Sequence, residues 1–277
     1  MSDFRGPSAR AKDLAAMRAK IAAIEAGGRA QAGVLPFGDA AIDGCLPGGG
    51  LPLGRWHEIG GTGLEVETAA APAAFTALMA APLARRGEVV WVLRRDDLWA
   101  PGLAGLGFPP ERLLQVCARD EAEALSVMED ALATVGVAAV VGEVEACDLT
   151  AGRRLQLACE KRGAAGFLIR RRPYGGQARR EAGGSAAATR WRIASAPSEP
   201  PAGEFGLGAP RFLAELERCR GGRTGAWLLE AAQAYEPAAG SYNPSGEMTD
   251  VAHPLRLVAD LGDRQLAPAQ PAHRTAA

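Results

Sequence analysis

The stretch RWHEIGGTGLEVETAA, residues 55–70, decides the fold class of this 277-residue chain. It begins as a short apolar strand, turns through a cluster of glycines and continues into an alanine-rich helix. A strand, a glycine-rich turn and a helix form the arrangement that binds phosphate on backbone N–H groups at a helix N-terminus. The stretch therefore predicts an α/β protein built around a turn of the nucleotide-binding type.

This turn departs from the Walker phosphate loop, G-x-x-x-x-G-K-[ST], at two positions that are important for phosphate binding. Gly61 and Thr68 match its first and last positions, but Val66 and Glu67 replace the second glycine and the lysine. The lysine normally attracts the β- and γ-phosphates. A glutamate there repels them, by roughly 4 kcal/mol for two unit charges about 4 Å apart at an effective dielectric of about 20. We expect this degenerate loop to bind no nucleotide and the chain to have no cofactor.

Composition narrows the class of protein further. The formal net charge is −1, so no overall basic field indicates nucleic acid or an acidic membrane as a partner. The cysteines are dispersed without a C-x-x-C pair, which argues against a zinc site or a disulfide framework. No targeting segment and no long apolar run is visible, and we expect a cytoplasmic location. The chain carries five cysteines, of which we expect Cys45, Cys117 and Cys159 to be buried.

Apolar runs alternate with helical patterns after the glycine turn. This spacing indicates βαβ units and a mainly parallel sheet flanked by helices. We predict an antiparallel extension toward the C-terminus, in which residues 224–230 pair with residues 189–194, and a helix at 211–219. The other predicted strands are 55–59, 88–93, 113–117, 135–141, 164–169 and 255–259, and the other predicted helices are 67–86, 121–134 and 150–162.

Three regions are predicted along the chain: a helical arm (1–30), a core domain (31–232) and a partly disordered C-terminal segment (233–277). In the arm, apolar residues recur at spacings of three and four, which places them on one narrow stripe of a helix. Such a stripe fits a helix that packs on a partner, and equally one that packs on its own domain. The stripe consists of Leu14, Met17, Ile21 and Ile24.

An arginine-rich segment lies between two predicted strands of the core. Its arginines are accompanied by one acid, Glu181, and by two glycine pairs. Arginines on such a segment suit phosphate contacts that are independent of nucleic-acid sequence. We predict a DNA-binding loop here; the alternative is a solvated surface loop. The candidate contacts are Arg170, Arg171, Arg172, Arg179, Arg180 and Arg190.

Together these features resemble the RecA family, and most closely its offshoot, the ImuA family of damage-inducible mutagenesis proteins. The resemblance covers roughly residues 33–230. It is carried by LPGGGLPLGRWHEIGG (46–61), which is similar to the entry, first core strand and loop of RecA, and by LGFPPERLL (106–114). It implies a RecA-like core. It also implies three protein partners: ImuB, which is Y-family-polymerase-like, RecA itself and an error-prone replicative-type DNA polymerase.

The resemblance also implies where catalytic residues would stand. The catalytic glutamate of the family falls on or near Arg95, and the Walker B aspartate falls on Gly142, so both roles are unfilled. Glu143 is adjacent, but alternation along a strand turns its side chain to the opposite face. We therefore expect no catalytic residue, no metal and no enzyme activity. The expected function is a non-catalytic accessory protein, or scaffold, of SOS-induced translesion synthesis.

Two alternatives to that expectation stay open. One is a divergent P-loop ATPase that uses Glu143 and Asp96 with Mg²⁺. The other is a DNA-binding mediator of recombinase assembly that depends on the arginine-rich segment.

Overall fold

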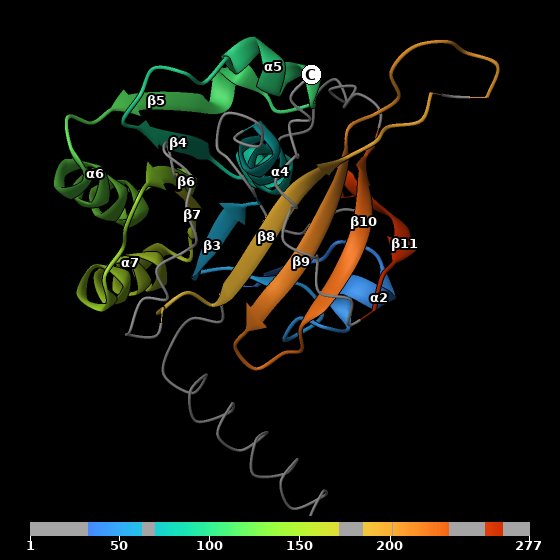
Figure 1. Ribbon diagram of the computed structural model, residues 1–277. Helices are drawn as coiled ribbons and strands as arrows, with labels where there is room; N and C mark the ends of the chain where they lie inside the picture. The colour runs from blue at the N-terminus through green and yellow to red at the C-terminus, as the bar shows by residue number, and fades with distance from the viewer. Residues whose placement is uncertain (1–32, 63–69, 172–184, 201, 233–252, 263–277) are drawn as a thin grey trace, which may run out of the picture. The chain divides into compact units, whose positions relative to one another are not determined.

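A nine-stranded mixed sheet forms the centre of the computed structural model, which describes residues 33–62, 70–171, 185–200, 202–232 and 253–262 (Figure 1). The strands follow the spatial order β11-β10-β9-β8-β3-β7-β6-β4-β5. They are β3 (Trp56–Gly61), β4 (Glu88–Leu93), β5 (Leu113–Cys117), β6 (Val137–Val144), β7 (Ala165–Arg170), β8 (Thr189–Ala196), β9 (Arg211–Cys219), β10 (Gly225–Ala231) and β11 (Leu255–Asp260).

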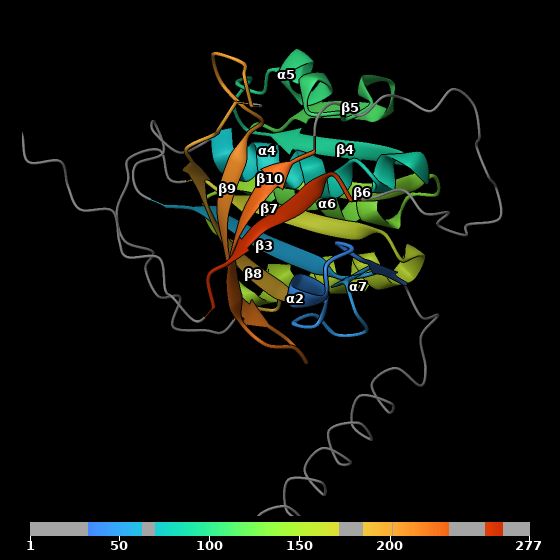
Figure 2. The same ribbon diagram turned by 90° about the vertical axis from the view of Figure 1, so that its right-hand side faces the viewer.

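Six neighbouring strands, from β8 to β5, are parallel to one another. The remaining strands add to β8 in antiparallel pairs and end at the edge strand β11, which lies beside β10 in Figure 2. The predicted fold class, a mainly parallel sheet with an antiparallel extension toward the C-terminus, is confirmed. A separate two-stranded sheet pairs β1 (Val34–Leu35) with β2 (Leu51–Pro52).

Helices cover both faces of the parallel part of the sheet, which explains why the central strands β4, β6 and β7 are apolar over most of their length. α4 packs on one face with β3, β7 and β8, and α6 and α7 pack on the other with β6, β4 and β7. The helices are α2 (Ala40–Asp43), α4 (Ala70–Ala80), α5 (Ala100–Gly105), α6 (Glu121–Ala133) and α7 (Leu149–Arg162), with 3₁₀ turns η1 (Leu83–Arg85) and η2 (Pro110–Arg112).

Short-range signals fix where α6 and α7 begin and where α7 ends. The carboxylates of Asp120 and Asp148 accept hydrogen bonds from backbone N–H groups of the first turn, as N-cap residues do. α7 ends at Gly163, whose φ of 76° lies in the left-handed region that glycine adopts without strain. The end of α7 sets the position at which the chain enters β7.

The face of the sheet toward α4 holds an aromatic core. Trp191 lies 6.0 Å from Trp227 and 5.8 Å from Phe75, measured between ring centroids. His57 is fully buried beside it, within 2.8 Å of Thr189 Oγ1 and 3.0 Å of the Pro52 carbonyl oxygen. Burial lowers the pKa of His57 to about 4, so this histidine is a neutral core residue.

Two predictions about the extension are wrong. Residues 211–219 form the strand β9 instead of a helix, since Phe212, Ala214 and Leu216 alternate inward with a period of two. Residues 225–231 form a strand, as predicted, but it pairs with β9 and β11 instead of with β8. Strand β9 takes the place beside β8.

Of the remaining predictions, some are confirmed and others are wrong. The predicted strand near the C-terminus is confirmed as β11, which joins the main sheet. Cys159 is buried as expected, whereas Cys45 is half-buried and Cys117 is exposed at the edge strand β5. No helix in the described ranges is long and apolar enough to cross a membrane. The arm, residues 1–30, lies outside the described residues.

Candidate functional site

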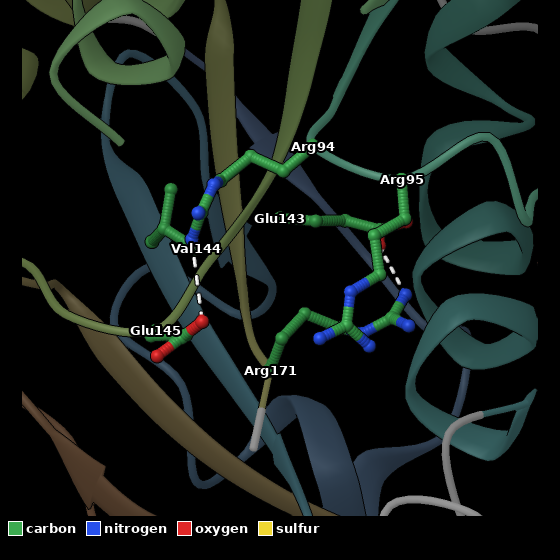
Figure 3. Close-up of a pocket in the computed structure, with 6 residues that line it drawn as sticks. All are labelled: Arg94, Arg95, Glu143, Val144, Glu145 and Arg171. Atoms are coloured by element: carbon green, nitrogen blue, oxygen red, sulfur yellow. Dashed lines mark hydrogen bonds and ion pairs between the residues drawn. The ribbon is translucent and has the colours of Figure 1, made fainter. Parts of the chain in front are cut away.

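The carboxyl ends of β4, β6 and β7 meet at one edge of the sheet, where ligands bind in open α/β folds. Side chains from these three ends line a pocket (Figure 3). The lining residues are Arg94 and Arg95 after β4, Glu143 and Val144 at the end of β6, Glu145 directly after it, and Arg171 after β7. The pocket is therefore lined mainly by arginine and glutamate.

Glu143 is the most buried of these charged groups, with 4% of its side chain exposed. One oxygen accepts a hydrogen bond from Trp91 Nε1 at 2.8 Å, and the other accepts from Arg171 Nη1. Burial raises the pKa of Glu143 above its ordinary value, while the Trp91 hydrogen bond and the Arg171 charge lower it. Both carboxylate oxygens are thus occupied by donors from within the chain.

Arg171 holds a second carboxylate. Its Nη2 lies 2.6 Å from Asp97 Oδ2 and its Nη1 lies 3.4 Å from Asp97 Oδ1, so the planar guanidinium binds Asp97 through two nitrogens. Its backbone N–H donates to the Val144 carbonyl, which fixes the start of the side chain. One arginine therefore connects the segments that follow β4 and β7 to the end of β6.

The structure gives Gly142 and Glu143 opposite orientations. A Cβ added to Gly142 would lie 2.1 Å from Met128 Sδ, so this position faces the packed layer of α6. Glu143 faces the other way and bonds to Trp91, which belongs to the core on the α4 side. Glu143 is therefore an acid on the α4 side of the sheet, whereas position 142 faces α6.

A surface network flanks the pocket. Arg94 Nη1 lies 3.3 Å from Glu145 Oε1 and 3.6 Å from Glu121 Oε1, as Figure 3 shows for the first pair. Glu121 in turn accepts the backbone N–H groups of residues 145 and 146. Arg95 and Asp96 are exposed beside this network. These groups hold the turn after β6 against α6 and β4.

The degenerate phosphate loop is described only at its start. Gly61 ends β3 at the same edge of the sheet. Val66, Glu67 and Thr68 lie outside the described residues. The absence of nucleotide binding stays a prediction. Among the residues that the structure describes, no group of three or more His, Cys, Asp or Glu side chains is placed to hold a metal ion.

The predicted DNA-binding arginines divide into two sets. Arg172, Arg179 and Arg180 lie outside the described residues. Arg170 and Arg190 lie 3.7 Å and 3.1 Å from the carboxylate of Glu58, which is 9% exposed and also accepts from Ser185 Oγ. Arg170 and Arg171, which precede residues 172–184 in the sequence, and Arg190, which follows them, are therefore all paired with carboxylates of the chain. DNA contact stays a prediction and depends mainly on the first set.

Sequence reasoning missed a cationic turn between β9 and β10. Its arginines hydrogen-bond to backbone carbonyls: Arg218 Nη1 and Arg220 Nη2 donate to Ser185 O, and Arg223 Nη2 donates to Gly44 O. Arg220 and Arg223 are exposed. The spacing R-C-R-G-G-R, residues 218–223, was the available signal. The incorrect prediction of a helix at 211–219 included the first two of these residues, so the turn was not recognised.

Sequence comparison finds close relatives of this chain. Protein ImuA of Caulobacter vibrioides strain NA1000 / CB15N is 58% identical over 256 residues, which cover 91% of this chain and 99% of the relative. Protein ImuA of strain ATCC 19089 / CIP 103742 / CB 15 matches to the same extent. No family model matches the chain.

Among solved structures, the RadB recombinase is similar with a TM-score of 0.46 and 18% sequence identity. The match covers 72% of this chain and 96% of RadB.

Proposed function

This chain belongs to the ImuA family, and from that premise we propose that it is a non-catalytic, RecA-like accessory protein of SOS-induced error-prone DNA repair. It binds partner proteins in translesion synthesis and does not hydrolyse ATP. The expected partners are ImuB, RecA and an error-prone replicative-type DNA polymerase, and DNA is a further expected contact. The expected compartment is the cytoplasm.

One observation carries the non-catalytic part of the proposal. The acid on the α4 side, Glu143, already binds an internal cation, Arg171, and an indole N–H. A Mg²⁺ ion would have to displace this guanidinium and then take oxygen ligands from a carboxylate that is 4% exposed. The sequence adds a repulsive Glu67 in place of the lysine. Phosphate and metal are both disfavoured at this edge.

Titration calorimetry with Mg²⁺ and ATP tests this part of the proposal. We expect no binding at millimolar ATP and no phosphate release, either alone or with ImuB and RecA present. Glu67→Ala is the matched variant. If the wild-type chain hydrolyses ATP and Glu67→Ala abolishes the activity, the proposal is wrong.

Co-purification tests the partner-binding part. Two truncations separate the terminal regions: removal of residues 1–28 deletes most of the predicted arm, and removal of residues 263–277 deletes the last residues of the chain but leaves β11 in place. A truncation that begins at residue 231 would instead also remove β11, the strand that pairs with β10. We expect the full chain to retain ImuB and RecA, and retention of neither would contradict the proposal.

A second candidate function, a divergent P-loop ATPase, is favoured by the orientation of Glu143 toward the α4 side. It requires Arg171 to release Glu143 when nucleotide binds. Tight Mg²⁺-dependent ATP binding in the same calorimetric experiment would support it.

A further inference from the structure

The connection between β8 and β9, residues 197–210, carries two large apolar side chains into solvent. Phe205 is fully exposed and Leu207 is 93% exposed, more than any other large hydrophobic residue described. Figure 1 shows this orange loop projecting beyond the ends of β8 and β9. Most connections between antiparallel neighbours have two to five residues, and long ones are often functional. Single exposed apolar residues are common, but a paired and projecting set is not.

The base of this loop is held in place. The carboxylate of Glu199 lies 3.3 Å from Arg211 Nη1, and Arg211 Nε lies 2.7 Å from Glu230 Oε2 on β10. The two arms touch at Gly208, because a Cβ there would lie 1.8 Å from the Glu199 carbonyl oxygen. The N–H of Ala231 also donates to the Pro210 carbonyl oxygen. The loop therefore rises from a fixed stem.

The tip adopts a backbone that glycine alone accommodates readily. Gly203 and Gly206 have φ values of 87° and 121°, and Gly206 separates Phe205 from Leu207. Prolines at 197, 200 and 210 restrict the chain on both sides. A restricted loop loses less conformational entropy on binding than a free one. The loop is therefore preorganised, with the side chains of Phe205 and Leu207 exposed before a partner binds.

The charge of the loop indicates which kind of protein surface would bind it. Residues 197–210 contain Glu199 and Glu204 and no lysine or arginine. Glu199 pairs with Arg211 at the stem, and Glu204 is exposed next to Phe205. The pocket at the carboxyl edge of this chain is lined by three arginines and two glutamates, which does not suit a phenyl and an isobutyl group. The charges and side chains favour a different protein over a second copy.

We infer that this loop is a docking element that inserts Phe205 and Leu207 into an apolar pocket on a different protein, with basic residues at the rim of the pocket facing Glu204. The inference rests on the proposed partner-binding function and assigns that function to one segment. Aromatic side chains buried at the centre of an interface commonly supply most of its binding energy. The rim charge chiefly affects the association rate and its dependence on salt.

The test compares two double variants of the full chain. Phe205→Ser with Leu207→Ser removes the tip, and Leu157→Ser with Val258→Ser removes two exposed apolar side chains from α7 and β11 as the matched control. Binding to purified ImuB and to purified RecA is measured by surface plasmon resonance. Thermal unfolding shows whether each variant keeps the fold, and sedimentation velocity measures self-association.

We expect the tip variant to bind its partner at least about 30-fold more weakly, with an unchanged melting temperature, and the control to bind like the wild type. Glu204→Lys should slow association and reverse part of its salt dependence. Unchanged binding by the tip variant to proteins that the wild type binds would overturn the inference and leave the proposed function intact. Loss of self-association alone would also overturn it, since the occupant would then be a second copy. If the wild type binds neither protein, the proposed function fails, and the inference fails with it.

Discussion

Arg171 donates to Glu143 across the ends of β7 and β6, so the cation beside this buried carboxylate is a side chain of the protein itself. The side chains of Arg171 and Glu143 are 17% and 4% exposed. A buried carboxylate without its cation is costly, whereas a neutral replacement of both partners costs much less. The pair therefore lends itself to a double-mutant test.

Arg171→Met should lower the free energy of unfolding by about 3 kcal/mol, because Glu143 then remains buried without its cation. Adding Glu143→Gln should recover more than half of that loss, since the amide oxygen can still accept from Trp91. Urea unfolding of the two single variants and the double variant measures the coupling. A double variant that is less stable than Arg171→Met would contradict this account of the pair.

Gly142→Asp, which would restore the family's aspartate at the position implied by the resemblance, should destabilise the fold without creating activity. The new Cβ would lie 2.1 Å from Met128 Sδ, and the carboxylate would enter the apolar layer between β6 and α6. Overpacking and an unpaired buried charge together should cost at least about 3 kcal/mol. The control, Gly142→Asp with Met128→Ala, should recover part of the stability. Full stability of Gly142→Asp would mean that this position does not face α6.

The parallel half of the fold was predictable because its central strands β4, β6 and β7 are nearly continuous apolar runs between clear helical patterns. The strand β9 was not. In its sequence RFLAELERC the residues Ala, Leu and Glu favour a helix, and the pairing with β8 and β10 overrides that local preference.

The site was predictable only in part, for a similar reason. Its acid and its position at the end of β6 follow from the sequence. The partners of that acid do not, since Trp91 and Arg171 lie 52 and 28 residues away along the chain.

Lowering the pH from 7.5 to 5 should destabilise the protein by about 4 kcal/mol through two histidines. Burial lowers the pKa of His57 and of His253 to about 4, below the ordinary value of 6.5. The unfolded chain takes up protons below pH 6.5 and the folded chain does so only near pH 4. The stability from each histidine is therefore complete above pH 6.5 and falls as the pH drops toward 4, by roughly 2 kcal/mol at pH 5. Urea unfolding at both pH values measures the difference.

His253→Gln should remove about half of this histidine-dependent loss. A loss that is unchanged in this variant would show that His253 is protonated in the folded state or already neutral in the unfolded state at pH 5.

Cys117 should react first with a thiol reagent at pH 8. It is exposed on the edge strand β5, whereas Cys159 is buried and its pKa is raised to about 12 by that burial. The thiolate is the reacting species, so the rate at Cys159 should be at least about a hundredfold lower. Mass spectrometry of maleimide-labelled peptides gives the order. Cys117→Ser should abolish the fast phase, and a fast phase that survives would place another thiol on the surface.

Two triple variants of equal charge should locate the proposed DNA contact. Replacement of Arg172, Arg179 and Arg180 by alanine removes the predicted loop contacts. Replacement of the arginines of the cationic turn, residues 218, 220 and 223, removes the same charge from another part of the chain. Arg170, Arg171 and Arg190 are left in place because their carboxylate partners make them structural.

We expect the loop variant to lose retention of single-stranded DNA and the turn variant to keep it. For each phosphate that a variant no longer neutralises, the slope of log affinity against log salt should fall by roughly 0.7. Fluorescence anisotropy with a labelled oligonucleotide from about 50 to 200 mM salt gives this slope, and melting temperatures check both folds. Weaker binding by the turn variant alone would move the DNA contact to residues 218–223. Equally weak binding by both variants would show that DNA affinity depends on the net charge of the chain. Unchanged binding by both variants would show that neither segment contacts DNA.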